Sequence, residues 1–172
     1  QLLNSGSSYA SSGAVYAVAC ADGSFSTSGS QCADVSNGNQ GQLLNTGSVH
    51  ATSGAKFQVP CIDGKYNGDG TGACADVSAG KQGQVLDSPS STHAVSGAVF
   101  EVDCVNGRFN ADGTGACDKV SPGKRGEDAS NAYAATGATQ EVDCADGSYN
   151  PDGDGVCADV PAGHQGQKGG KG

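Results

Sequence analysis

The 172-residue chain has no tryptophan and no methionine, and its large aliphatic and aromatic side chains are few. Leucine, isoleucine, valine and phenylalanine together number 25, whereas glycine alone supplies 29 residues. A soluble chain this poor in large apolar groups usually cannot bury enough surface to offset its conformational entropy. The composition therefore argues against one ordinary globular domain with a single core.

Basic residues are also scarce: nine Lys and Arg stand against 18 Asp and Glu, for a net charge of −9. This balance argues against a basic patch of the kind that binds nucleic acid or an anionic membrane surface. No apolar run approaches the length of a membrane span, so we expect no membrane insertion. The first residue is Gln1 rather than Met, as expected of a mature secreted chain or of a fragment.

Eight cysteines reverse the expectation of disorder. An even number of cysteines in a chain of low hydrophobicity predicts a disulfide framework and an oxidising, extracellular setting. No Cys-x-x-Cys spacing occurs, which disfavours the alternative of a zinc protein. We therefore expect a secreted or cell-surface protein.

One pattern occurs four times along the chain. The stretch SGAVFEVDCVNGRFNADGTGAC, which begins at Ser96, has relatives that begin at Ser12, Ser53 and Thr136. Units of about 40 residues are too small to bury a core alone, so we predict an elongated array of stacked units. The predicted units are 1–41, 42–83, 84–126 and 127–166, followed by a Gly/Lys-rich tail at 167–172.

Each unit contains a strand pattern followed by a turn pattern. Ala98, Phe100, Val102 and Cys104 alternate with residues of the opposite face, which predicts a strand. The pattern recurs at 14–20 and 55–61, whereas in the fourth unit Gln140 replaces the aromatic residue. An Asp-Gly or Asn-Gly pair then predicts a tight hairpin turn, and the next aromatic residue is expected to pack back across it. The predicted fold is all-β, with four small β-hairpin units and no single large core.

Repeat symmetry favours bridges between neighbouring cysteines, although other pairings are open to eight cysteines. The two cysteines of a unit are 12 or 13 positions apart, around a Gly-rich loop. Closing a loop of this size stabilises a unit by about 3 kcal/mol, mainly by restricting the unfolded chain. The predicted bridges are Cys20–Cys32, Cys61–Cys74, Cys104–Cys117 and Cys144–Cys157.

The stretch CADGSYNPDGDGVCADVPAGHQG, residues 144–166, resembles the cysteine-rich repeat of ephrin-receptor-like extracellular proteins. That repeat reads roughly Cys-x-x-Gly-x-Tyr, a Gly-containing loop and then Cys-x-x-Cys-x-x-Gly. The resemblance implies an extracellular, modular, non-enzymatic β-rich repeat. This chain departs from the pattern where the family commonly has its third cysteine, so that a bridge through this position is absent; the residues there are Val35, Val77, Val120 and Val160.

Three of the Gly-rich loops place oxygen-bearing side chains at alternate positions before a glycine, as calcium-binding loops do. The candidate ligands are Asn67, Asp69, Asn110, Asp112, Asn150, Asp152 and Asp154. The glutamate that completes an EF-hand is missing, and the loop of the first unit has no carboxylate. The alternative is a Gly/Asx turn that closes the disulfide loop without metal. We expect that the fold requires no cofactor, and calcium is the one candidate ion.

A ring stands three residues before each Ser/Thr-Gly pair, at Tyr9, His50, His93 and Tyr133. It is expected either to pack between successive units or, if exposed, to stack on a sugar. The three histidines have no recurring Ser/Asp or Cys/Asp partner, and all eight cysteines are assigned to bridges. We therefore expect no enzymatic activity.

No Asn-x-Ser/Thr sequon occurs, which excludes conventional N-glycans. Hydroxyl-rich segments at the unit starts are candidates for O-linked sugars, with a solvated linker as the alternative. The candidate O-glycosylation residues are Ser7, Ser8, Ser11, Thr46, Ser48, Thr52, Ser88, Ser90, Ser91 and Thr92.

These features favour a structural role, in which the repeats self-associate into a secreted or cell-surface fibre, stalk or coat. Strand patterns such as GAVFEVDC are suited to pairing with neighbouring chains, because exposed strand edges are normally either covered or used. The alternative is a binding module: a calcium-dependent adhesion segment, or a receptor-like or lectin-like ectodomain. The candidate assembly residues are the apolar side chains at the unit starts, Leu2, Leu3, Leu43, Leu44, Val85 and Leu86.

Overall fold

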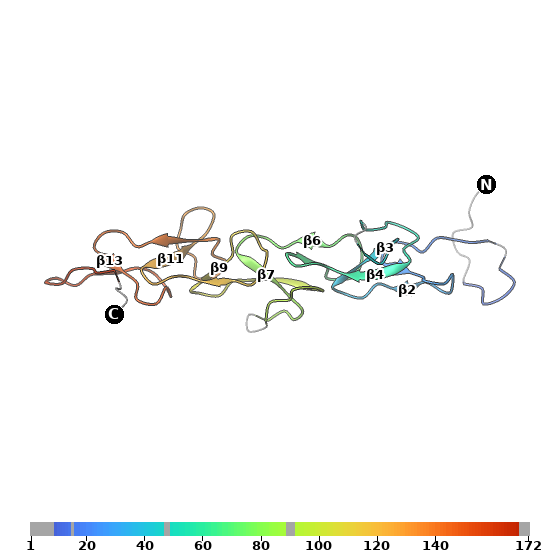
Figure 1. Cartoon of the computed structure of the whole chain (residues 1–172), viewed down its shortest axis with the longest axis horizontal. Helices are drawn as coiled ribbons and strands as arrows, with labels where there is room; N and C mark the ends of the chain where they lie inside the picture. The colour runs from blue at the N-terminus through green and yellow to red at the C-terminus, as the bar shows by residue number, and fades with distance from the viewer. Residues whose placement is uncertain (1–8, 15, 47–48, 89–91, 169–172) are drawn as a thin grey trace.

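The computed structural model describes residues 9–14, 16–46, 49–88 and 92–168. These residues form an elongated rod of short antiparallel strand pairs (Figure 1). They contain no helix, and hence none that is long and apolar enough to cross a membrane. The prediction of an all-β fold made of small hairpin units is confirmed.

Fourteen strands occur in the described part of the chain. They are β1 (Ser24–Phe25), β2 (Ala33–Asp34), β3 (Asn39–Gln42), β4 (Phe57–Pro60), β5 (Lys65–Tyr66), β6 (Ala75–Asp76), β7 (Lys81–Gln84), β8 (Phe100–Asp103), β9 (Arg108–Phe109), β10 (Asp118–Lys119), β11 (Lys124–Glu127), β12 (Gln140–Asp143), β13 (Ser148–Tyr149) and β14 (Ala158–Asp159).

Two kinds of strand pair alternate along the rod. Two-residue pairs, such as β5 with β6, join a strand inside a disulfide loop to the two residues that follow the second cysteine of that loop. Four-residue pairs join the end of one sequence unit to the strand of the next, as β3 pairs with β4 from Asn39↔Pro60 to Gln42↔Phe57. β7 pairs with β8, and β11 with β12, in the same register. The sequence boundaries after residues 41, 83 and 126 therefore fall inside strands, and we call each four-residue pair with its surroundings a junction.

The predicted turn is present, but the predicted partner across it is wrong. Lys65 N–H donates to the Ile62 carbonyl at 3.1 Å, and Gly64 has a φ of 76°, so residues 62–65 form a tight turn. β4 nevertheless pairs with β3 of the preceding unit, and β5 pairs with β6. The bridge between Cys61 and Cys74 places β6 next to this turn, so that β6 rather than β4 lies beside β5.

The strand predicted at 14–20 does not form. Residues 16–19 lie outside every strand, and no backbone hydrogen bond joins them to another described residue. The matching segments in the other units become strands because the closing strand of the preceding unit pairs with them. Without such a partner, Tyr16 and Val18 are 81% and 69% exposed. In the fourth unit, β12 forms although Gln140 replaces the aromatic residue, because β11 pairs with β12.

The core consists of one small cluster at each junction. At the second junction Val77 and Ala98 are buried, and a Cβ placed on Gly83 would lie 2.9 Å from the Ala98 Cβ and 3.6 Å from a Val77 methyl. Only glycine leaves room for this approach of two strands. The valines that replace the third cysteine of the resembled repeat thus supply apolar packing; the equivalent clusters are Gly41 with Ala55 and Val35, and Gly126 with Ala138 and Val120.

Four disulfides close the loops. In each inner unit the backbone of the first cysteine is also hydrogen-bonded to the preceding and the following unit. Cys61 N–H donates to the Gly38 carbonyl at 2.8 Å, and the Cys61 carbonyl accepts from Gly97 N–H at 2.7 Å. Cys104 is bonded in the same way to the units on both of its sides. A disulfide therefore lies at each point where three successive units meet. The bridges are Cys20–Cys32, Cys61–Cys74, Cys104–Cys117 and Cys144–Cys157.

Candidate functional site at the unit junctions

The aspartate of each early turn is hydrogen-bonded to a ring of the following unit. Asp22 Oδ1 lies 2.7 Å from His50 Nε2 and 3.3 Å from the Gly72 nitrogen. Asp63 Oδ1 lies 2.7 Å from His93 Nε2. A carboxylate only accepts hydrogen bonds, so the imidazole Nε2–H is the donor. We call this link, from a turn side chain to a ring of the next unit, the turn–ring contact.

The third turn–ring contact has the same geometry without a carboxylate. The Tyr133 hydroxyl donates to Asn106 Oδ1 at 3.0 Å, and Gly155 N–H donates to the same oxygen at 3.2 Å. Of the two expectations for the recurring ring, contact between successive units is therefore what the structure has at His50, His93 and Tyr133. Tyr9, the ring of the first unit, is 52% exposed.

The two aspartates have pKa values below the ordinary 3.8 of an aspartate. For Asp22 the largest cause is the hydrogen bond from His50, and the Gly72 N–H also lowers the pKa. For Asp63 burial raises the pKa, but the hydrogen bonds from His93 and from two backbone N–H groups together outweigh it. Both carboxyls are therefore ionised in the contact at neutral pH, which strengthens the hydrogen bonds that they accept.

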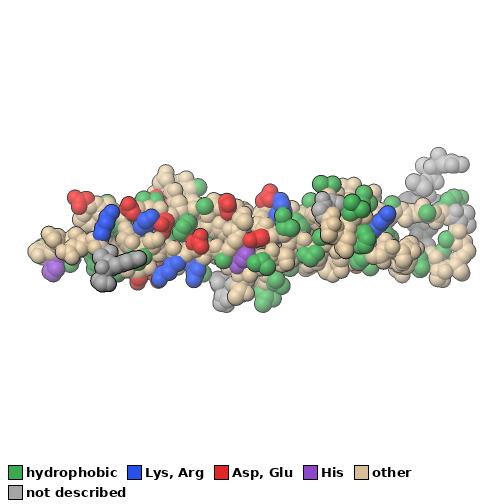
Figure 2. All heavy atoms as spheres, viewed as in Figure 1, with side chains coloured by type: hydrophobic (Ala, Val, Ile, Leu, Met, Phe, Trp, Pro, Cys, Tyr) green, Lys and Arg blue, Asp and Glu red, His purple; other side chains and the backbone are tan. Residues whose placement is uncertain are grey.

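A lysine–glutamate ion pair reinforces the second and the third junction. Lys81 Nζ lies 3.0 Å from Glu101 Oε1, and this carboxylate also accepts from Ser78 N–H at 2.9 Å. Burial raises the pKa of Glu101, yet the hydrogen bonds from Ser78 and Lys81 bring it below its ordinary value. The first junction has the uncharged Asn39 and Gln58 at the matching positions. Figure 2 accordingly shows most charged side chains on the half of the rod that contains β7 to β13.

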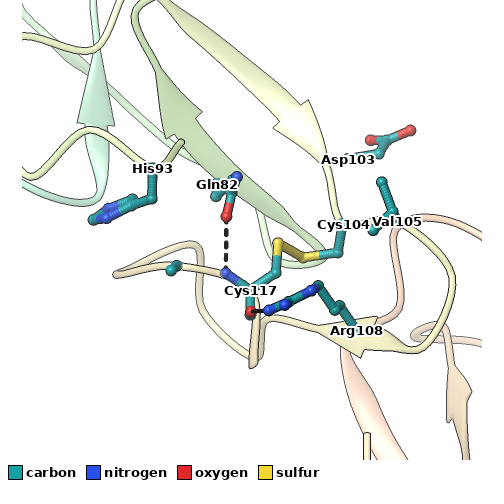
Figure 3. A pocket seen from close by; sticks show the side chains of 8 residues that line it. Gln82, His93, Asp103, Cys104, Val105, Arg108 and Cys117 are labelled. Carbon is teal, nitrogen blue, oxygen red and sulfur yellow. Dashed lines mark hydrogen bonds between the residues drawn. A yellow bond between two sulfur atoms is a disulfide. The ribbon is translucent and has the colours of Figure 1, made fainter. Parts of the chain in front are cut away.

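A glutamine in each of the first two junctions was not singled out from the sequence. Gln40 Oε1 accepts from Cys74 N–H, and Gln82 Oε1 accepts from Cys117 N–H, both at 2.9 Å. Figure 3 shows the second of these hydrogen bonds. Each glutamine thus ties a closing strand to the second cysteine of the next unit. The repetition of glutamine one position before the junction glycine, which also occurs at Gln165, was the signal that pointed to it.

The third junction replaces this glutamine by an internal ion pair. Arg125 stands at the position of Gln40 and Gln82, and its guanidinium donates to Glu127 Oε1 at 2.7 and 3.0 Å. Glu127 is buried, as is the glutamine at the same position of the first two junctions. The arginine therefore satisfies a carboxylate that would otherwise be buried alone.

A hollow of about 260 Å³ lies beside the Cys104–Cys117 bridge (Figure 3). Its polar side chains are engaged with the chain itself: Gln82 with Cys117 N–H, Arg108 with the Cys117 carbonyl at 2.8 Å, and His93 with the preceding turn. No two of its lining residues form a nucleophile–base pair. The absence of enzymatic activity stays a prediction.

In the calcium candidate loops the side-chain oxygens accept backbone hydrogen bonds. Asn67 Oδ1 accepts from Gly70 N–H at 2.9 Å, and Asp69 Oδ1 accepts from Thr71 N–H at 2.8 Å. Asn110 with Asp112, and Asn150 with Asp152, repeat this arrangement, and Asp154 is exposed. Within the described residues no three His, Cys, Asp or Glu side chains are grouped to hold a metal ion. The geometry is that of an Asx turn, and calcium binding stays a prediction.

Several of the residues proposed from the sequence lie outside the described part of the chain: Leu2, Leu3, Ser7, Ser8, Ser48, Ser90 and Ser91. Among the other O-glycosylation candidates, Ser88 is half-buried. The exposed ones are Ser11, Thr46, Thr52 and Thr92. The remaining assembly candidates are at least half exposed, so their apolar surface is open to a further contact; they are Leu43, Leu44, Val85 and Leu86.

The junctions are therefore the place where this chain concentrates its specific polar contacts. They combine strand pairing, a small buried cluster and a turn–ring contact, and each part recurs at a fixed position of the repeat. The resemblance to the ephrin-receptor-like repeat rests on the sequence motif. Comparison with protein-family models, with curated proteins and with solved structures finds no match.

Proposed function

We propose that the protein is an extracellular structural repeat protein, the subunit of a secreted or cell-surface fibre, stalk or coat. The observation that carries the proposal is the repetition of one junction three times, at β3–β4, β7–β8 and β11–β12. Because each unit is bonded to the unit before and the unit after, the rod is a one-dimensional stack with no central core. Such a stack is suited to spacing and assembly.

The four disulfides point to an oxidising, extracellular or secreted environment. They support a role outside the cell, where a thin protein with little apolar core needs covalent bridges to stay folded. The polar side chains of the junctions bind the chain to itself, which supports a structural rather than a catalytic role.

Exposed side chains at the unit starts support self-association and a sugar coat. Apolar side chains are scattered in small groups along the rod rather than gathered in one patch, on the face that Figure 2 shows. Leu43 and Leu86 belong to such exposed positions at two unit starts. Exposed hydroxyls at Ser11, Thr46 and Thr92 are open to O-linked sugars.

The experiment that tests the function is electron microscopy of the native, non-reduced protein over a concentration series. We expect regular filaments with an axial period. Dispersed single particles at every concentration would overturn the fibre role, and a receptor-like or adhesive ectodomain would then be the function to pursue.

A further inference from the structure

We propose that the two ends of the described rod are complementary, so that residues 164–166 of one copy pair with residues 17–19 of a second copy of this chain. The inference rests on the proposed function and names the partner and the surface of assembly. It follows from comparing each end with the internal junctions, residue by residue.

One end carries a segment that resembles β3 in sequence but is not part of a strand in the described structure. The segment His164–Gln165–Gly166–Gln167 matches the NQGQ of Asn39–Gln42. His164 N–H donates to the Pro161 carbonyl at 3.1 Å, as Asn39 N–H donates to Ser36, so the turn that leads into the strand is already formed. A Cβ on Gly166 would lie 3.7 Å from a Val160 methyl, which is also the spacing from Gly41 to Val35.

The other end carries the segment that accepts such a strand. Residues 14–20 match 55–61, the part of the second unit that contains β4, but they lie outside every strand. Val18 is exposed where Val59 is half-buried, and Ala14 is exposed where Ala55 is buried. The register of β3 with β4 carries over to the two ends as His164↔Ala19, Gln165↔Val18 and Gly166↔Ala17.

At each end of the described rod, one partner of a contact found in every internal junction is present and the other is missing among the described residues. Asp146, the last turn aspartate, accepts from its own Gly147 N–H at 3.0 Å, and no ring among the described residues reaches it. At the other end Tyr9 is exposed and contacts no turn side chain among the described residues. A Cβ on Gly70 would lie 2.0 Å from the Val35 carbonyl oxygen, whereas Gly29, its counterpart in the first unit, faces open space. A second copy would bring each half to its partner.

Both ends also lack the same hydrogen bond, one its donor and the other its acceptor. Each internal junction has a Gln or Glu that accepts from a serine N–H, as Gln58 does from Ser36 at 3.0 Å. At the ends proline stands in place of the serine and alanine in place of the acceptor, at Pro161 and Ala17. Proline has no N–H, so the junction would bury no unsatisfied donor. This paired loss favours a second copy over an unrelated partner.

A side-chain contact of the internal junctions is also available between the two ends. By the register given above, Gln165 Oε1 meets the Cys32 N–H of the second copy, as Gln40 Oε1 meets the Cys74 N–H at 2.9 Å. Head-to-tail copies would therefore form one continuous rod.

The test uses one variant at each end. Gly166→Val adds a side chain that has only an ordinary contact with Val160 in the free chain. In the proposed junction it would collide with Ala14 of the second copy, because a Cβ at Gly41 lies 2.9 Å from the Ala55 Cβ. Ala14→Leu blocks the same contact from the other side. Val156→Ala, at an exposed position of the last unit, is the matched control.

Sedimentation velocity of the non-reduced, full chain over a concentration series gives the readout. We expect linear polymers for the unaltered chain and for Val156→Ala, and the mass of one chain for Gly166→Val and for Ala14→Leu. An equimolar mixture of the two blocked variants keeps one intact end of each kind, so it should give dimers and nothing longer. Formation of these dimers also shows that both variants are folded.

Two results would overturn the inference, and only the first of them would also overturn the proposed function. If the unaltered chain stays monomeric at every concentration, both the self-associating function and the head-to-tail junction are wrong. If the unaltered chain and both blocked variants polymerise alike, the junction is wrong but the structural function stands, with association along the sides of the rod.

Discussion

The turn side chain sets how each junction responds to acid. Asp22 and Asp63 accept hydrogen bonds as carboxylates, whereas Asn106 makes the same turn–ring contact without a titratable group. A carboxyl whose pKa is lower in the folded state stabilises the fold above its unfolded pKa. That contribution is lost as the pH falls through the folded pKa. Two of the three turn–ring contacts are thus sensitive to acid.

We predict that the Asp22→Asn/Asp63→Asn double variant loses less stability on acidification than the unaltered chain does. The ordinary aspartate pKa is 3.8 and both folded values lie below it, so the affected contribution is present at pH 5 and is lost as the pH falls from about 3.8 through the folded pKa values. The measurement is the free energy of unfolding by denaturant at pH 5 and at pH 2.5. Glu101 and Glu141 also have lowered pKa values and keep their acid response in both proteins.

Asp128→Asn serves as the comparison for this prediction, and by the same linkage it should also weaken the acid response, but without changing a turn–ring contact. The Asp128 pKa is also lowered, chiefly by a hydrogen bond from Ser130, but Asp128 makes no turn–ring contact. An equal acid response in the double variant and the unaltered chain would show that the two turn–ring contacts do not carry the pH dependence assigned to them.

A junction glycine is needed only where a second strand lies against it. We predict that Gly83→Ala destabilises the protein by about 1–3 kcal/mol, because its Cβ would lie 2.9 Å from that of Ala98 in a packed cluster. Gly166→Ala is the matched control, since it stands at the same repeat position and its nearest neighbour, Val160, is 3.7 Å away. Thermal unfolding of both variants, at a concentration where the chain is monomeric, measures the difference. Equal midpoints would contradict the account of the core.

At the scale of the strand, a regular pattern predicted an element but not its partner. The alternation at 55–61 is real: Phe57 and Val59 are half-buried, and Gln58 and Pro60 are exposed. Period-two patterning says which face is inward and nothing of which strand lies alongside. The pairing partner, β3, has the sequence NQGQ, which has no apolar residue and little strand propensity. It becomes a strand because Gly41 lets it approach Ala55, a tertiary reason that the local sequence does not contain.

The ion pair within β11 gives a prediction at the same scale. Arg125→Ala leaves the buried Glu127 carboxylate without its charged donor and should destabilise the third junction by about 1–3 kcal/mol. The double variant Arg125→Gln/Glu127→Gln restores the residues of the first two junctions. We expect it to be close to neutral, since a buried ion pair can be replaced as a whole at little cost.

Denaturant unfolding of the single and the double variant decides between these expectations. The single variant Glu127→Gln, which removes the charge and keeps the shape, is the further control. A double variant that is less stable than Arg125→Ala alone would show that the third junction depends on its ion pair in a way that the other two do not.

At the scale of the molecule, the repeat could be predicted because the same sequence pattern recurs four times. The contacts between units could not be predicted. The rings at His50 and His93 were visible as a recurring position, and contact between units was one of two expectations for them. Their acceptors lie 28 and 30 residues earlier in the chain, and no local pattern relates the two. Val77 is a similar case: it was noted as the place of a missing cysteine, and the structure makes it part of the core.

Loss of one disulfide bridge should affect the stability of neighbouring units as well as that of its own. Cys104 is bonded through its backbone to Gly80 of the preceding unit and Gly137 of the following unit, at 2.8 Å each. Removing the bridge by Cys104→Ala/Cys117→Ala should reduce stability by about 3 kcal/mol. Because neighbouring units share these bonds, amide hydrogen exchange should become faster in β7 and β12 as well as within the opened loop.

The equivalent change in the last unit, Cys144→Ala/Cys157→Ala, supplies the comparison. Cys144 N–H donates to Gly123 at 2.9 Å, but its carbonyl has no backbone partner among the described residues. Faster exchange should therefore extend only toward the third unit. If the central variant exchanges faster within its own disulfide loop alone, the units are independent modules in series. The shared backbone bonds would then not carry stability from one unit to the next, and a head-to-tail copy would gain nothing from a pre-formed neighbour.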